Sequence, residues 1–98
     1  MLYKFKSKNA GDVIMLEPNG RRILEVIGKD AGPKGIVLPG EMLAAIAALQ
    51  AEIAAEEKAL KEADAEPLEG PGLRQRAMPF IDLLQRSQRS GDEVVWGV

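Results

Sequence analysis

Hydrophobic and polar residues alternate at the start of the chain. Tyr3 and Phe5 fall on one side of an extended backbone, and three lysines fall on the other: Lys4, Lys6 and Lys8. A period of two predicts a strand with one buried face over residues 2–8.

A turn and a short apolar stretch follow this strand. The segment 9–11 reads Asn-Ala-Gly, and Asn and Gly both tolerate the positive φ of tight turns. Residues 12–16 then predict a second strand that pairs with the first as a hairpin. A first helical turn is the alternative, because so short an apolar run suits either element.

The next apolar residues recur with a helical period. They share one face: Gly20, Ile23, Leu24 and Ile27. Pro18 suits the first turn of a helix and Gly28 suits its C-terminal cap, so we expect a helix over 18–28. Two glycines and a proline predict a loop over 30–35.

Two longer helices are expected in the second half. Residues 39–64 carry an apolar stripe that Glu56 interrupts, namely Met42, Ile46, Leu49, Ile53 and Leu60. After a Pro- and Gly-rich connection over 66–72, a third helix carries Leu73, Ala77, Phe80, Ile81 and Leu84 on one face. Pro79 should kink or restart this helix, and Gly91 should end it. Alternation over 94–98 predicts a terminal strand in which Trp96 anchors the core.

Together these elements predict an α+β fold in a single domain, residues 1–98. A small mixed sheet of two to three strands would form from the N-terminal hairpin and the C-terminal strand. Three helices would pack on it, and the second and third would form a long helical hairpin.

The composition narrows the chemistry. The chain contains no histidine and no cysteine, which excludes a Ser-His-Asp triad, a Cys-His pair and an ordinary zinc site. We therefore assign no catalytic, cofactor-binding or metal-binding residue. A carboxylate-dependent enzyme that uses Asp12 and Glu17 is the least favoured alternative, because each residue also has a structural role at a turn or a helix start.

The lysine row raises a second alternative, an anion or nucleic-acid binder. Lys4, Lys6 and Lys8 would be joined by Arg21 and Arg22 if the first helix lay beside that face. A solvated strand face that blocks edge-to-edge pairing is the favoured interpretation. Nucleic acid is further disfavoured because no stacking aromatic shares the lysine face.

The second helix also predicts self-association. It is long for a small sheet, and small alanines fill much of its surface outside the apolar stripe, including Ala48 and Ala55. A two-fold contact is the commonest way to bury such a surface, so we expect a homodimer. The acidic middle of the chain would then face basic groups across the axis.

Four segments resemble a known family when taken in order: residues 1–7, 11–15, 76–84 and 94–96. They are similar to a family of small bacterial proteins known only as a domain of unknown function. The resemblance covers nearly the whole chain, implies a cytoplasmic bacterial protein and supplies no functional residue. The chain shows no signal peptide and no membrane-spanning run, which also favours the cytoplasm. The favoured function is thus a non-enzymatic interaction or regulatory module with an unidentified protein partner.

Overall fold

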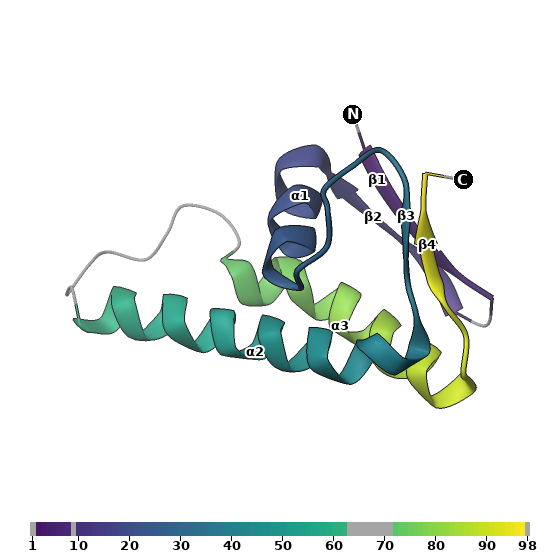
Figure 1. The fold of residues 1–98 in the computed structure, drawn as a ribbon. Helices are drawn as coiled ribbons and strands as arrows, with labels where there is room; N and C mark the ends of the chain where they lie inside the picture. The colour runs from purple at the N-terminus through teal and green to yellow at the C-terminus, as the bar shows by residue number, and fades with distance from the viewer. Residues whose placement is uncertain (1, 9, 63–71, 98) are drawn as a thin grey trace.

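The computed structural model describes residues 2–8, 10–62 and 72–97 (Figure 1). Its elements run in the order β1 (Leu2–Ser7), β2 (Ala10–Leu16), α1 (Glu17–Val26), β3 (Gly35–Val37), α2 (Pro39–Glu62), α3 (Leu73–Ser90) and β4 (Val94–Trp96). The three helices lie together on one side of the sheet, so the chain forms two layers. The α+β class with three helices is confirmed.

The N-terminal hairpin forms as predicted. β1 and β2 pair antiparallel, so residues 12–16 are a strand and not a helical turn. The register shifts between Phe5 and Ser7, where β2 carries one extra residue, which is a β-bulge. Asn9, part of the predicted turn, lies outside the described residues.

The sheet is larger than predicted and has a different pairing. It has four strands in the order β2-β1-β4-β3, one more than the two to three predicted, and every neighbouring pair is antiparallel where a mixed sheet was expected. The missed strand, β3, begins at Gly35, the last residue of the predicted loop. β3 has only three residues and is flanked by glycines and prolines, so its sequence shows no alternation of apolar and polar residues that would predict a strand. These residues become a strand because β4 lies alongside and pairs Ile36 with Val95.

The first helix begins one residue before the predicted start and ends at Val26. Gly28 follows with a φ of 78°, a left-handed conformation that glycine adopts without strain, which confirms its expected place at the helix end. The predicted apolar face is also correct, because Gly20, Ile23 and Leu24 are buried.

Helices α2 and α3 form the predicted antiparallel hairpin (Figure 1). α2 is described as far as Glu62, so the last two residues of the predicted 39–64 helix, and most of the connection that follows, lie outside the described residues. α3 continues through Pro79 as a single helix and does not restart there. It ends at Gly91, whose φ is 71°.

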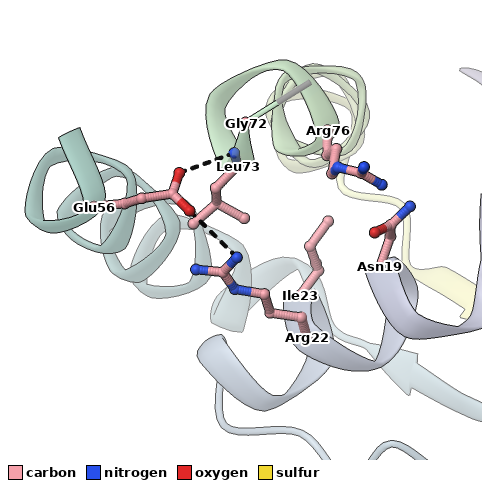
Figure 2. A pocket seen from close by; sticks show the side chains of 7 residues that line it. All are labelled: Asn19, Arg22, Ile23, Glu56, Gly72, Leu73 and Arg76. Carbon is pink, nitrogen blue, oxygen red and sulfur yellow. Dashed lines mark hydrogen bonds and ion pairs between the residues drawn. The ribbon is translucent and has the colours of Figure 1, made fainter. Parts of the chain in front are cut away.

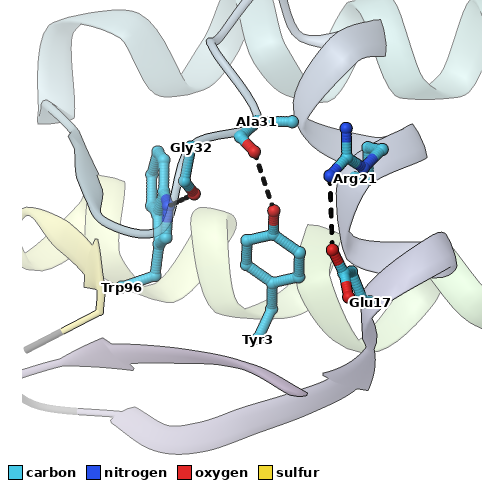
Figure 3. Close-up of polar contacts among 6 residues, drawn as sticks. All are labelled: Tyr3, Glu17, Arg21, Ala31, Gly32 and Trp96. Carbon is cyan, nitrogen blue, oxygen red and sulfur yellow. Dashed lines mark hydrogen bonds and ion pairs between the residues drawn. The ribbon is translucent and has the colours of Figure 1, made fainter. Parts of the chain in front are cut away.

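The core lies between the helices and the inner face of the sheet. Phe5 is its aromatic centre, with ring centroids 4.7 Å from Phe80 and 5.8 Å from Trp96 in edge-on geometry. Two aromatic residues also hold the loop after α1 (Figure 3). The Tyr3 hydroxyl donates to the Ala31 carbonyl at 2.9 Å, and the Trp96 indole N–H donates to the Gly32 carbonyl at 3.2 Å. The core role expected for Trp96 is confirmed.

Candidate functional site

The side of the sheet that faces away from the helices carries a mixed apolar and basic surface. We call it the outer face and define it by Leu2, Lys4, Lys6, Asp12, Ile14, Leu16, Ile36 and Val95. Successive side chains of a strand point to opposite faces of the sheet, so these side chains point away from the helices. The buried residues that alternate with them point toward the helices: Tyr3, Phe5, Met15, Val37, Val94 and Trp96. The helices occupy only the inner side, and none covers the outer face.

The strand register determines which side chains of the outer face are neighbours. Leu2 lies directly opposite Leu16, and Lys4 lies opposite Ile14. On the other side of β1, Val95 of β4 lies opposite both Lys6 and Ile36. The lysines of β1 therefore lie between two groups of aliphatic side chains. One group is on β2, and the other is formed by Val95 of β4 and Ile36 of β3.

The lysine row is only partly neutralised. The Lys4 ammonium lies 3.7 Å from a carboxylate oxygen of Asp12, and both side chains are largely exposed. Lys6 and Lys8 form no ion pair within the part of the chain that the structure describes. The outer face therefore has a net positive charge.

The two arginines that the sequence groups with these lysines lie elsewhere. α1 packs on the inner face of the sheet, against Tyr3. Arg21 pairs with Glu17 at 3.2 Å one turn earlier in α1, and Arg22 reaches α2, where it pairs with Glu56 at 3.4 Å. The structure therefore does not assemble the five cations into one anion-binding patch.

Arg22 instead borders a pocket of about 240 Å³ between the three helices (Figure 2). On one side of the pocket the Glu56 carboxylate accepts hydrogen bonds from the backbone N–H of Leu73 at 3.0 Å and from the Arg22 guanidinium at 3.4 Å. Glu56 thus ties α2 to the first turn of α3 and to α1. The sequence indicates Glu56 only as the break in the apolar stripe of α2. It does not predict the hydrogen bond, because Leu73, which donates its backbone N–H, lies seventeen residues later in the chain.

The carboxylates proposed as a catalytic pair do not meet. Asp12 lies in β2 on the outer face beside Lys4, and Glu17 starts α1 beside Arg21. Four strand residues separate them in an extended conformation, which corresponds to ~16 Å along the chain. Each carboxylate therefore has a cation as its neighbour, and the geometry gives no support to a shared acid–base role.

Among the described residues, two carboxyl groups have lowered pKa values, and both belong to surface ion pairs. The pKa of Glu41 is lowered by hydrogen bonds from the Lys29 ammonium and from the backbone N–H of Leu38. The pKa of Glu57 is lowered by the Arg74 guanidinium, whose two hydrogen bonds to it are both 2.8 Å long. The first pair ties α2 to the loop after α1, and the second ties α2 to α3, so both act as links between elements of the fold.

The remaining sequence-based candidates lie on α2. Ala48 is half-buried and Ala55 is exposed. Among the described residues, no group of three or more acidic side chains is placed to hold a metal ion. No described helix is long and apolar enough to cross a bilayer.

A family model described as "Domain of unknown function (DUF1840)" matches residues 1–96. No curated protein and no solved structure matches the chain.

Proposed function

The chain belongs to the family described as a domain of unknown function (DUF1840), which supplies no activity, and we propose that it is a non-enzymatic interaction module. Its binding surface is the outer face of the sheet. The partner is another protein whose contact segment combines aliphatic side chains with carboxylates.

The observation that carries this proposal is the exposure of aliphatic side chains on the outer face. Leu2, Ile14, Leu16 and Ile36 are 57%, 57%, 62% and 41% exposed, and they make up most of the large exposed hydrophobic residues in the described chain. An exposed apolar group is common, but several gathered on one uncovered face are typical of a surface that binds a protein.

The lysines determine the kind of partner. Lys4 and Lys6 lie in the middle of the outer face, with Asp12 as the nearby carboxylate. A partner that brings its own carboxylates to this position would pair with the lysines while its aliphatic groups cover those on either side. A second copy that packed face to face would instead set lysines against lysines, which costs binding energy.

A nucleic-acid ligand fits the outer face less well than a protein. Single-stranded nucleic acid binds through bases stacked on aromatic rings. Tyr3, Phe5 and Trp96 are buried on the inner face, so the outer face offers lysines without a stacking platform. The aliphatic groups beside the lysines have a natural role only in contact with another apolar surface.

Site-specific photo-crosslinking in the native cells tests the proposal. A photoreactive amino acid replaces Ile36 on the outer face, and in a matched control it replaces the exposed Ala51 on α2. We expect a discrete adduct with a different protein from position 36 and none from position 51. The crosslinked peptide should contain aliphatic and acidic residues.

Three results would contradict the proposal. An adduct of twice the chain's mass from position 36 would show that a second copy occupies this face. Adducts of equal yield from both positions would show unspecific contact. The absence of any adduct at position 36 would leave the outer face without an occupant in the cell.

A further inference from the structure

Strand β2 forms one edge of the sheet. It pairs with β1 on one side only, and on its other side no backbone hydrogen bond from residues 10–16 is present within the described chain. The opposite edge, β3, has only three residues, whereas β2 has seven. An open edge of this length offers a row of N–H and C=O groups to another strand.

Half of this edge lacks the features that usually prevent pairing. The bulge opposite Lys6 involves Gly11 and Asp12, and a bulge with a charge blocks regular pairing there. The other half, residues 13–16, pairs regularly with β1 and reads Val-Ile-Met-Leu, with neither proline nor charge. Ile14 and Leu16 are also among the most exposed aliphatic residues of the outer face.

The charges beside the edge suit an identical partner. The bulged end has the Lys4–Asp12 pair, and the end that leads into α1 has the Glu17–Arg21 pair. A second β2 that runs antiparallel brings the bulged end of one copy against the α1 end of the other, and each of these ends carries one acidic and one basic side chain, so neither has a net charge that opposes the contact. The lysines of β1 stay one strand away from the seam, unlike in a face-to-face contact.

We infer that two copies of this chain pair through residues 13–16 of β2, antiparallel and across a two-fold axis. The two sheets then form one continuous sheet of eight strands, with all helices on one side. Antiparallel pairing lets the same segment serve as both partners, as an isologous contact requires. The outer faces of the two copies then join into a single surface of double width. This self-association is additional to the binding of another protein proposed above.

Sedimentation velocity over a wide dilution series tests this inference. We expect the wild-type chain to change from dimer to monomer on dilution. Ile14→Glu should remain monomeric throughout, because it places a charge in the seam. Within one chain the new carboxylate faces Lys4, so the fold should persist, and a far-ultraviolet circular dichroism spectrum equal to that of the wild type checks this.

Two matched variants locate the contact. Ile36→Glu makes the same change on the other edge strand and should dimerise like the wild type. Ala55→Glu on α2 should do likewise. A wild-type monomer at every concentration would overturn the inference, as would a dimer that survives Ile14→Glu. Loss of the dimer in Ile36→Glu or Ala55→Glu but not in Ile14→Glu would move the contact to the outer face or to α2.

Hydrogen exchange supplies a second readout on the unaltered chain. Along an antiparallel strand, the backbone N–H groups point alternately toward the neighbouring strand and away from it. Residues 14 and 16 form one set and residues 13 and 15 form the other, so one set points its amides away from β1, toward the open edge. That set should gain protection as concentration rises, while the other set stays protected throughout. Equal exchange of the outward amides at low and high concentration would contradict strand pairing. Neither measurement depends on a partner for the outer face, so this inference and the proposed function can fail separately.

Discussion

Gly20 shows how a single residue sets the distance between two layers. It lies in α1 where the helix crosses β1, and a Cβ built at this position would lie 2.5 Å from Cδ2 of the Tyr3 ring. The nearest atoms include Tyr3 Cβ, so the ring cannot simply swing away. The sequence placed Gly20 on the buried face, but only the packed structure shows which side chain it meets.

Gly20→Ala should therefore destabilise the protein by about 1–3 kcal/mol, the usual cost of overpacking a core. Gly40→Ala is the matched control, because a Cβ there meets nothing within 4 Å in helix α2. It should be neutral or slightly stabilising. Chemical denaturation of both variants measures the difference, and equal stabilities would mean that α1 can move away from the sheet without cost.

Glu41 makes stability depend on pH. Its carboxylate accepts both the Lys29 ammonium at 2.8 Å and the backbone N–H of Leu38 at 2.9 Å, which lowers its pKa in the folded state. A lowered pKa means that the contribution is complete above the ordinary carboxyl pKa and is lost as pH falls through the folded value.

The free energy of unfolding of the wild type should therefore fall more from neutral to acidic pH than that of Glu41→Gln. The two proteins should converge in stability below the folded pKa of Glu41. Urea titrations at a series of pH values test this. Parallel pH profiles for the two proteins would show that the Lys29 contact does not persist in solution.

At the scale of elements, the sequence predicted the helices and strands whose own residues show a hydrophobic period. It missed the strand that forms only by pairing with a neighbouring strand. The apolar stripe of α2 as far as Ile53, the stripe of α3 and the alternation in β1 were correct because each element needs a buried face, whereas Leu60 at the end of the α2 stripe is not in the core. β3 was missed because Ile36 and Val37 become a strand only through pairing with β4. Glu56 was seen as a break in a stripe, and its bond to Leu73 follows from the hairpin packing.

Pro79 tests whether α3 needs its irregular position. It is exposed inside the helix and cannot donate to the Gln75 carbonyl. Pro79→Ala should leave the stability unchanged or raise it, by at most the ~3 kcal/mol that an interior proline costs. Thermal unfolding beside an exposed control, Met78→Ala, measures this. A substantial loss in Pro79→Ala alone would show that the proline shapes α3 for packing.

β4 is the element on which the sheet depends most. It pairs with β1 on one side and β3 on the other, and Val94 and Trp96 are buried. A chain that ends before Val94 should be unfolded, because both ladders and the Trp96 ring are lost together. Far-ultraviolet circular dichroism with thermal melting tests this, and a truncated chain that melts near the wild-type temperature would refute the central position of β4.

At the scale of the whole molecule, the two-layer arrangement explains why one surface is left to bind. Three helices satisfy the inner face of a four-stranded sheet, and nothing in the described chain covers the outer face. The sequence revealed the lysine row, because alternation in β1 is local. It did not reveal that Ile14, Leu16 and Ile36 join this row, because their positions follow from strand register.

The central claim is that the outer face is covered by a partner in the cell, and native lysines report on this directly. The protein is acetylated with an amine-reactive reagent in native extract and, separately, after purification, and each lysine is quantified by mass spectrometry. Lys4 and Lys6 lie on the outer face, and Lys58 on α2 is a control with 75% of its side chain exposed. We expect Lys4 and Lys6 to be protected in the extract relative to the purified protein, with Lys58 labelled equally in both. Equal labelling of all three lysines in both samples would contradict the claim.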